Sequence, residues 1–333
     1  MLILGNEPVR SVLDGREEAV VELVRRCYLT HARGDTSLPH SVFLRFADQP
    51  RDRIIALPAR VGGEQRIAGV KWIASFPGNV SAGVARASAT IILNSMDTGQ
   101  PLAVVEGSTI SARRTAASAA LAAATLGSAN GRGVALIGCG VINFEVLRFL
   151  RTTNPGLTEV TLFDLSQERA RSFAARCARE PGGPAATVAD RLEDALGAHT
   201  LISFATTAGV PHTGLAHCLP GSLVLHLSLR DIQPEALLDK DNVVNVVDDA
   251  DHVCREATSV DLAARLAGHR DFIQAALGDV LAGSSPYDRD PRRVTVFSPF
   301  GLGILDIALA DFVRVEAVAR GVGTHLTDFL PPA

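Results

Sequence analysis

Residues 134–143 read Val-Ala-Leu-Ile-Gly-Cys-Gly-Val-Ile-Asn, and residues 144–150 continue at helical spacing. An apolar strand, a glycine turn and the start of a helix therefore follow one another directly. Gly138 permits a tight turn, Gly140 lets a phosphate approach the backbone, and the first N–H groups of the helix attract an anion. Asn143 stands where the dinucleotide-binding fingerprint has its third glycine. The succession still predicts a Rossmann-type nucleotide site.

A second apolar stretch, residues 160–163, follows the turn and ends in Asp164. This acid lies about 20 residues beyond the turn, where a carboxylate binds the ribose hydroxyl groups of a dinucleotide. No arginine directly follows Asp164, which favours NAD over NADP. The pattern therefore predicts a bound nicotinamide cofactor, and a purely structural α/β turn is the alternative.

The rest of the chain predicts an α/β protein of two domains, because 333 residues are enough for two cores. Consecutive strand-like stretches before the glycine turn indicate a mainly antiparallel sheet, and they are residues 42–46, 53–59, 67–74, 87–94 and 102–106. An alanine-rich helix over 111–126 leads into alternating strands and helices, which is typical of a doubly wound parallel sheet. A last helix over 304–320 is expected to return to the first domain.

Composition excludes several classes of partner. A formal net charge of −4 gives no electrostatic footprint for nucleic acid or an anionic membrane. The N-terminus has no secretory signal pattern, and the alanine-rich run over 115–126 is too short to span a bilayer. The five cysteines are scattered and predict reduced thiols. We therefore expect a cytoplasmic protein.

Lys71 and Arg45 each interrupt an otherwise apolar strand. Alternation places Lys71 on the face of Gly69 and Ile73, where loss of hydration would favour its neutral form and suit it to act as a base. A lysine that protects an edge strand from aggregation is the alternative. Arg45 presents a planar fork that matches a carboxylate, or it simply extends to the rim of the sheet.

Arg113 and Arg114 fall in the first turn of the helix predicted over 111–126. Cations oppose the helix dipole there, so the pair suggests that an anion binds nearby, either a cofactor phosphate or a substrate carboxylate. The alternative is an exposed pair of little consequence.

Asp231 follows the strand predicted over 223–227, at the carboxyl end where a doubly wound sheet binds its ligand. A carboxylate in that place can transfer a proton beside a nicotinamide. It can equally cap the helix that begins near Pro234.

Other polar residues give weaker signals. Cys139 is expected to be a small filler within the glycine turn. His212, His217 and Cys218 lack the spacing of a zinc site, so no metal is predicted. The acidic residues Asp248, Asp249 and Asp251 are expected to form a solvated loop.

Together these segments resemble the ornithine cyclodeaminase/μ-crystallin family over essentially the whole chain. The matching segments are Gly69-Val-Lys71, Ser111-Ala-Arg-Arg-Thr-Ala-Ala117, Gly138-Cys-Gly140 and Phe300-Gly-Leu-Gly-Ile-Leu-Asp306. Longer strings resemble the branch of the family that forms 2,3-diaminopropionate, and they cover residues 39–46, 53–58, 71–77, 106–112, 138–145 and 298–301.

The resemblance implies a Rossmann NAD-binding domain over 122–304, inserted in a smaller α+β domain. Residues 1–121 and 305–333 would form that smaller domain, which binds substrate and makes a homodimer. By the same resemblance, Arg45 and Arg114 hold a substrate carboxylate, Lys71 lies beside the reacting carbon–nitrogen bond, and Asp231 is the acid or base. The implied cofactor contacts are Ser88, Arg114, Thr115, Gly138, Gly140, Val141, Ile142, Asn143, Asp164 and Ser298.

The resemblance also implies a reaction on a small substrate derived from amino acids. NAD would oxidise N-(2-amino-2-carboxyethyl)-L-glutamate, and hydrolysis would give 2-oxoglutarate and L-2,3-diaminopropionate for a siderophore or a peptide antibiotic. An ornithine or lysine cyclodeaminase is one alternative, and a μ-crystallin-like protein that binds a ligand together with nicotinamide is another. Cyclodeaminases carry the catalytic aspartate in a Gly/Pro-rich stretch with a lysine nearby, whereas here the nearest following lysine is Lys240.

Overall fold

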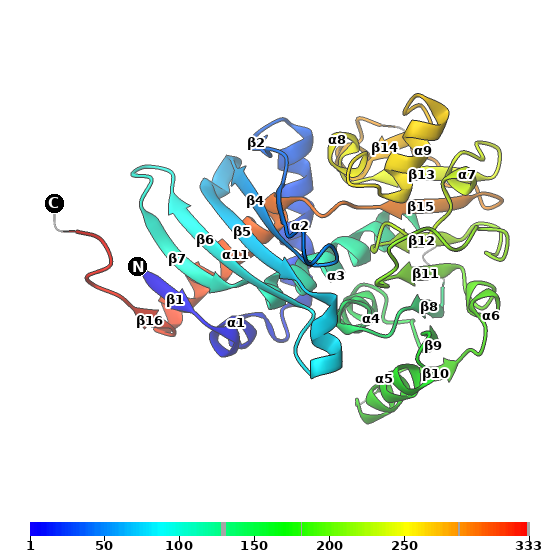
Figure 1. Cartoon of the computed structure of the whole chain (residues 1–333), viewed down its shortest axis with the longest axis horizontal. Coiled ribbons are helices and arrows are strands. Elements are labelled where there is room, and N and C mark those ends of the chain that lie inside the picture. Colours follow the sequence, from blue (N-terminus) through cyan, green and yellow to red (C-terminus); the bar gives the residue numbers. More distant parts are fainter. Residues whose placement is uncertain (128–130, 181, 286, 332–333) are drawn as a thin grey trace. The chain divides into compact units, whose positions relative to one another are not determined.

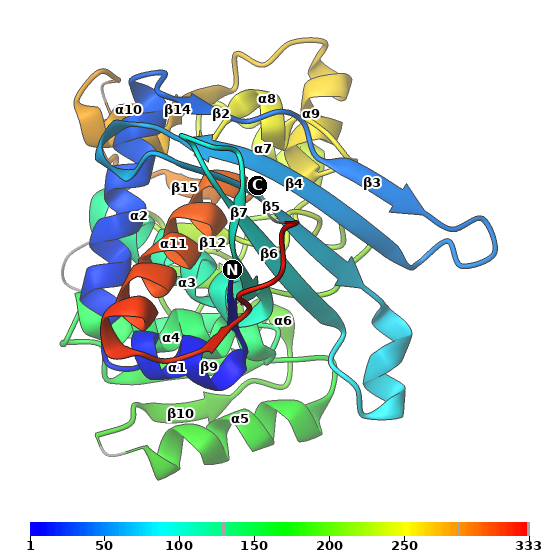
Figure 2. The ribbon, with the colours of Figure 1, turned by 90° about the vertical axis from the view of Figure 1, so that its left-hand side faces the viewer.

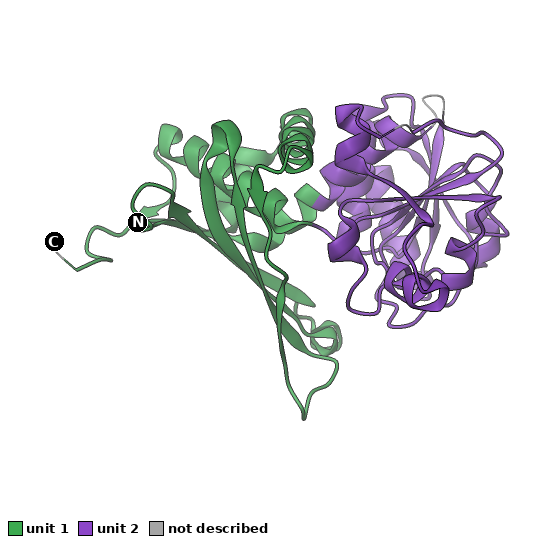
Figure 3. Cartoon of the chain, turned by 90° about the horizontal axis from the view of Figure 1, so that it is seen from above, with its two compact units in different colours: residues 1–114, 302–333 green, residues 115–301 purple. Residues whose placement is uncertain are grey.

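The computed structural model describes residues 1–127, 131–180, 182–285 and 287–331, and the chain forms two compact units (Figure 3). Unit 1 contains Met1–Arg114 and Leu302–Ala333, and unit 2 contains Thr115–Gly301. The domain boundaries predicted at 121/122 and 304/305 lie a few residues further along the chain than these. Unit 1 is therefore built from both ends of the sequence.

Unit 1 is a mainly antiparallel sheet in the order β16-β1-β7-β6-β5-β4-β2, with β3 paired to β4 (Figure 1). Its strands are β1 (Leu2–Leu4), β2 (Thr36–Ser37), β3 (Val42–Arg45), β4 (Arg53–Val61), β5 (Ile67–Ser75), β6 (Ala87–Ser95), β7 (Pro101–Glu106) and β16 (Thr324–His325). Its helices are α1 (Asn6–Leu13), α2 (Glu17–Ala32), the first part of α3 (Gly107–Leu126) and α11 (Gly303–Arg320), with short 3-10 turns at Gly63–Gln65 and Pro77–Ala82. The order places β5 inside the sheet, between β6 and β4.

Helix α11 covers one face of this sheet and packs against β4 to β7 and against α2 (Figure 2). Its side chains are almost all buried between residues 303 and 311. Gly69 allows the close approach, since a Cβ on it would lie 3.1 Å from the Cδ1 of Ile307 and 2.2 Å from the carbonyl oxygen of Ile92. The buried face of β5 is thus held against the first turns of α11.

Unit 2 is an all-parallel sheet in the order β10-β9-β8-β11-β12-β15-β13-β14. Its strands are β8 (Gly133–Ile137), β9 (Glu159–Phe163), β10 (Ala185–Val188), β11 (Leu201–Phe204), β12 (Leu223–His226), β13 (Val243–Val247), β14 (Ile273–Ala276) and β15 (Val294–Ser298). Its helices are the rest of α3, α4 (Val141–Thr153), α5 (Gln167–Arg179), α6 (Leu192–Leu196), α7 (Pro234–Leu237), α8 (Ala250–Val253), α9 (Ser259–Ala267) and α10 (Leu277–Ala282). The predicted α/β class with a Rossmann-type parallel sheet is confirmed.

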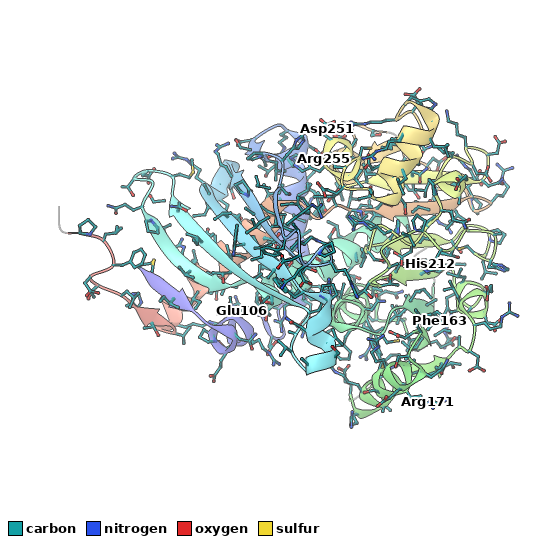
Figure 4. All side chains as sticks on the ribbon, in the orientation of Figure 1. Glu106, Phe163, Arg171, His212, Asp251 and Arg255 are labelled. Carbon is teal, nitrogen blue, oxygen red and sulfur yellow. The ribbon has the colours of Figure 1, made fainter. Side chains whose placement is uncertain are left out.

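Helix α3 begins at Gly107, four residues before the predicted start at Ser111. The reason is Glu106, at the end of β7, whose carboxylate accepts the backbone N–H groups of Ser108 at 2.5 Å and Thr109 at 3.1 Å (Figure 4). An acidic residue that binds free N–H groups is a strong helix start. Arg113 and Arg114 therefore lie in the second turn, and the prediction that they oppose the dipole from the first turn is wrong.

Within the described residues, no helix is both long and apolar enough to cross a membrane. In the same part of the chain, no group of three or more His, Cys, Asp or Glu side chains is arranged to hold a metal ion.

Candidate active site

Four polar residues gather inside unit 1 around the carboxylate of Asp306, and we call them the Lys71 cluster: Lys71, Ser111, Arg114 and Asp306. The Nζ of Lys71 lies 2.6 Å from Asp306 Oδ2 and 3.3 Å from Ser111 Oγ. The Nε of Arg114 donates to the other oxygen, Asp306 Oδ1, at 3.1 Å. Lys71 is 2% exposed and Asp306 is 0% exposed. One buried carboxylate therefore binds two buried cations.

The cluster is desolvated because β5 is a central strand and α11 covers it. Burial lowers the pKa of Lys71 to about 8, with Asp306 opposing this change and Arg114 adding to it. A lysine with such a pKa can give up and take back a proton near neutral pH. The alternative interpretation of Lys71 as an exposed guard of an edge strand is wrong, since both neighbours of β5 are paired to it.

Arg45 lies away from this cluster, at the exposed end of β3, with its guanidinium carbon 5.0 Å from the ring centre of Phe43. The strand register pairs Arg45 with Arg53 of β4, and it pairs Arg53 with Ser75 of β5. All three residues therefore lie on the sheet face that carries Lys71. Arg86 donates to Ser75 Oγ at 3.0 Å, and burial lowers its pKa. Neither Arg53 nor Arg86 was predicted as a site residue.

The two remaining predicted residues near this sheet differ in position. Ser88 is exposed and alternates with Ala89 and Ile91, so it lies on the face opposite Lys71. Thr115 follows Arg114 in α3 and is half-buried. The structure does not bring Ser88 to the Lys71 cluster.

Arg113 is a structural residue rather than one of an exposed pair. Its side chain is buried and its Nη2 bonds Asp14 at the end of α1. Arg114 is also buried, on Asp306. The alternative of two exposed arginines is therefore wrong for both residues.

In unit 2, the glycine turn has the geometry that its sequence predicts. Gly138 has a φ of +92°, and a Cβ there would lie 2.6 Å from the carbonyl oxygen of Ala205, so only glycine fits without strain. A Cβ on Gly140 would meet nothing within 4 Å, which leaves its backbone accessible. Helix α4 begins directly afterwards with Val141 and Ile142. The turn therefore offers an open helix N-terminus to an anion.

Asn143 replaces the third glycine by bonding to the turn from within. Its buried Nδ2 donates to the carbonyl oxygens of Ile137 at 3.0 Å and Gly138 at 2.7 Å. The hydroxyl of Ser203 on β11 donates to its Oδ1 at 2.7 Å. The amide thus ties α4 to two neighbouring strands.

Asp164 follows Phe163, the last residue of β9 (Figure 4), and bonds to the glycine turn. Its Oδ2 accepts the N–H of Cys139 at 2.9 Å, and its Oδ1 accepts the N–H of Ser166 at 2.8 Å. Arg169, in the first turn of α5, donates to Oδ1 from Nε at 3.3 Å and from Nη2 at 3.1 Å. Arg169 was not predicted as a site residue, because it lies five positions beyond Asp164 and not directly after it.

Asp231 lies at the carboxyl end of the sheet, completely buried, and does not cap a helix. The hydroxyls of Thr206 and Ser228 donate to its two carboxylate oxygens, and its own N–H donates to His226 Nε2 at 3.2 Å. Burial raises its pKa, but its hydrogen-bonded surroundings outweigh burial and hold the pKa below its ordinary value. Helix α7 begins after Gln233 instead.

The loop before Asp231 is strained. Leu229 has a φ of +66°, a conformation that costs a residue with a side chain free energy. The N–H of Ser259 bonds the carbonyl oxygen of Leu229 at 2.7 Å, and Arg230 bonds the carbonyl oxygen of Glu256 at 2.7 Å. These contacts with the segment before α9 hold the loop, as is common at functional sites.

Asp248 corrects the prediction of a solvated acidic loop. It is buried, and its carboxylate accepts the N–H groups of Phe300 at 2.8 Å and Gly301 at 2.7 Å. Asp249 caps α8, and of the three only Asp251 is well exposed (Figure 4). It forms an ion pair with Arg270. Asp248 is therefore a structural acceptor for the segment after β15.

Comparison with known proteins agrees with this geometry over almost the whole chain. The sequence profile of the ornithine cyclodeaminase/mu-crystallin family matches residues 17–321. N-((2S)-2-amino-2-carboxyethyl)-L-glutamate dehydrogenase of Staphylococcus aureus is 28% identical over 331 residues, which is 98% of each chain. The crystal structure of CmnK is 30% identical, with a TM-score of 0.91 and 99% of each chain covered.

A third relative is an archaeal alanine dehydrogenase dimer, solved with bound NAD. It is 27% identical to this chain, with a TM-score of 0.89 and 99% of each chain covered. The resemblance predicted from the motifs is therefore confirmed. This chain belongs to the ornithine cyclodeaminase/mu-crystallin family.

Proposed function

We infer that this protein is an NAD-dependent dehydrogenase that converts N-(2-amino-2-carboxyethyl)-L-glutamate to 2-oxoglutarate and L-2,3-diaminopropionate. The observation that carries the proposal is the buried Lys71, whose pKa of about 8 allows proton transfer and which is held by Asp306 together with Arg114. A purely structural lysine gains nothing from a lowered pKa, whereas a base or a polarising group needs it.

The residues of unit 2 fit a dinucleotide. Gly138 and Gly140 expose backbone for the pyrophosphate at the start of α4, and Asp164 suits the ribose hydroxyls. Val141, Ile142 and Ser298 are further proposed contacts, while Asn143 supports the turn from inside. The relative solved with NAD supports this choice of cofactor. When bound, NAD⁺ supplies the acceptor for a hydride.

The arginines support a substrate that carries several carboxylates. Each carboxylate that leaves water needs a charged partner, and arginine binds it with two parallel bonds. Arg114 is beside Lys71, and Arg45, Arg53 and Arg86 follow at one end of the same strands. The proposed substrate has three carboxylates, and the named activity of the Staphylococcus aureus relative concerns this compound.

The chain's own groups supply the proton transfers. The glutamate α-carbon loses its hydride and the C–N bond becomes a C=N bond, with one proton released from the nitrogen. Lys71, in its neutral form, accepts a proton from the amine or from the water that adds to the C=N bond. Asp231 returns a proton to the departing nitrogen as the C–N bond breaks. Diaminopropionate then leaves for a siderophore or a peptide antibiotic.

The test incubates the purified protein with NAD⁺ and candidate amines, and follows absorbance at the NADH band together with the products. NADH and 2-oxoglutarate in equal amounts from N-(2-amino-2-carboxyethyl)-L-glutamate support the proposal. Ammonia and a cyclic imino acid from ornithine or lysine, without net NADH, would identify a cyclodeaminase. Binding of these ligands without turnover would identify a nicotinamide-dependent binding protein.

We also propose a homodimer that forms through the uncovered face of the unit 1 sheet. The face opposite α11 exposes apolar side chains on three strands, namely Val42, Leu44, Trp72 and Ile92. Trp72, the single tryptophan, is 45% exposed. A contiguous apolar face of this kind marks an interface. Light scattering of the wild-type protein and of Trp72→Glu tests the proposed homodimer. We expect a wild-type dimer and a monomeric variant, and a monomeric wild-type protein would refute the proposal.

A further inference from the structure

His226 is a completely buried histidine that the proposed reaction does not yet use. It is the last residue of β12, and the register places it beside Phe204 of β11. β12 also pairs with β15, whose last residue is Ser298. The carboxyl ends of three adjacent central strands thus converge on this imidazole.

The hydrogen bonds of His226 assign its tautomer. The Nε2 accepts the backbone N–H of Asp231 at 3.2 Å, so this nitrogen carries a lone pair in the neutral ring. The proton is then on Nδ1, which donates to Ser298 Oγ at 3.3 Å. Ser298 therefore orients the ring, and the basic nitrogen faces Asp231.

The same basic nitrogen lies 3.3 Å from the carboxylate oxygen Oδ2 of Asp231. That carboxylate is 0% exposed, whereas the hydroxyls of Thr206 and Ser228 that donate to it belong to half-buried side chains. A proton from outside consequently reaches Asp231 through a hydroxyl, and His226 is on the inner side. We propose that His226 is a positioning residue that orients Asp231 and shares its proton, so that the two side chains act as one acid/base unit.

The transfer is balanced within the unit. A hydroxyl passes its proton to Asp231 and regains one from the reacting group, and the Oδ2–H then donates to His226 Nε2. Moving this proton onto Nε2 gives an imidazolium beside a carboxylate, and the reverse step returns the proton for the departing nitrogen. The inference rests on the proposed function, because it assigns the acid/base role to Asp231.

The surrounding groups leave His226 as the ionisable partner of Asp231. Its Nε2 lies 3.3 Å from the Oδ2 of Asp231. From the neighbouring elements, Thr206, Ser228 and Ser298 present uncharged hydroxyls. The guanidinium of Arg230 donates to the carbonyl oxygen of Glu256. His212 is an exposed residue (Figure 4), and its backbone N–H donates to the carbonyl oxygen of Asp231.

The test compares two variants that keep different halves of the ring's contacts. His226→Gln places an amide near the Nε2 position that faces Asp231, whereas His226→Asn places one near the Nδ1 position that faces Ser298. His226→Asn removes the acceptor of the Oδ2–H, so it should lower kcat about tenfold while the KM for the amine stays within about twofold. His226→Gln should recover part of this loss, because its amide oxygen still accepts the Oδ2–H, although it cannot take the proton. Equal losses of kcat in both variants would overturn the proposal.

A second measurement does not depend on the substrate. Imidazole ¹⁵N signals of the NAD⁺-saturated wild-type protein, with His226 identified from its absence in His226→Gln, should show the tautomer protonated on Nδ1. Asp231→Asn should shift the Nε2 signal, because an amide replaces the carboxylate oxygen 3.3 Å from this nitrogen. An Nε2-protonated ring, or an Nε2 signal that Asp231→Asn leaves unchanged, would overturn the proposal. If the wild-type protein binds NAD⁺ but does not oxidise the amine, the proposed dehydrogenase function fails. The imidazole ¹⁵N signals still decide the role of His226 in that case.

Discussion

The Nζ of Lys71 lies 2.6 Å from the Oδ2 of Asp306, and neither side chain is more than 2% exposed. The two residues are 235 positions apart in the sequence, on β5 and on the first turn of α11. Burial without a counter-ion would be costly for the lysine, and the carboxylate limits how far its pKa falls. The C-terminal helix therefore adjusts the protonation of a residue near the other end of the chain.

Replacing Asp306 by Asn should affect both stability and pH dependence. Lys71 and Arg114 would lose their shared partner, and breaking a buried ion pair costs about 3–5 kcal/mol of unfolding free energy. The pKa of Lys71 should fall further, because Asp306 raises it. Urea unfolding and the pH profile of kcat/KM measure the two effects.

The matched control is Asp311→Asn on the same helix, since Asp311 pairs with the less buried Arg314 at 2.8 Å. It should cost less than Asp306→Asn, because a single and partly exposed cation loses its partner, and it should leave the pH profile unchanged. A profile that is also unchanged in Asp306→Asn would show that Asp306 does not adjust Lys71.

The rate of amine oxidation should depend on the neutral form of Lys71. With a pKa of about 8, the neutral fraction is about one half at pH 8 and levels off about one pH unit higher, so kcat/KM should follow the same curve. Lys71→Met should lower kcat at least about 100-fold, because a general base contributes that much or more. Lys71→Arg, which keeps the charge but cannot release a proton, should be equally inactive. An active Lys71→Arg enzyme with the wild-type profile would exclude Lys71 as the base.

The Asp164–Arg169 pair should decide between NAD⁺ and NADP⁺. The carboxylate of Asp164 accepts two hydrogen bonds from the guanidinium of Arg169 and would repel a 2′-phosphate. Asp164→Asn should therefore raise NADP⁺ affinity about tenfold while NAD⁺ affinity falls, in titrations followed by calorimetry.

Two further variants isolate the arginine. Adding Arg169→Ala to Asp164→Asn should remove the gain in NADP⁺ affinity, since the phosphate then has no partner. Arg171 is an exposed arginine of the same helix (Figure 4), and adding Arg171→Ala to Asp164→Asn should leave the gain in NADP⁺ affinity unchanged. If Asp164→Asn gains NADP⁺ affinity equally without Arg169, the pair is not the selecting element.

Asp248→Asn should destabilise the protein without changing the chemistry. The carboxylate accepts N–H groups of Phe300 and Gly301, and one of these would face the amide NH₂ group of asparagine instead. A buried donor left unpaired costs about 1–3 kcal/mol. Thermal unfolding should show the loss while the KM for the amine stays within about twofold at a temperature where the variant is folded. Unchanged stability would show that these bonds are replaced by water.

The sequence predicts much of the fold because local patterns determine it. The apolar strand, glycine turn and helix at 134–150 define the nucleotide end of the parallel sheet, and the consecutive strands before residue 107 define the antiparallel one. The start of α3 was predicted too late, since capping by the side chain of Glu106 is not visible in apolar periodicity. Strand β14 and the short β1 and β16 were not predicted, because they depend on pairing with distant strands.

In the candidate site too, local patterns were predicted and contacts between distant segments were not. Lys71 and Asp231 stand out because each is a charge at an apolar strand or its end, but their partners come from elsewhere in the fold. Asp306 was missed although it is an acid in the first turn of an otherwise apolar helix, which is a usable signal. His226 offers a similar signal as a histidine within an apolar strand. The burial of Asp248 depends on backbone N–H groups of residues 300 and 301, which no sequence pattern reveals.

The most direct test of the proposed reaction uses N-(2-amino-2-carboxyethyl)-L-glutamate with deuterium on the glutamate α-carbon. The wild-type protein should transfer that deuterium to NAD⁺ and release 2-oxoglutarate and diaminopropionate, with one labelled nicotinamide for each 2-oxoglutarate. Mass spectrometry of the reduced cofactor measures the transfer. Unlabelled NADH, or release of 2-oxoglutarate without any reduced cofactor, would contradict the account.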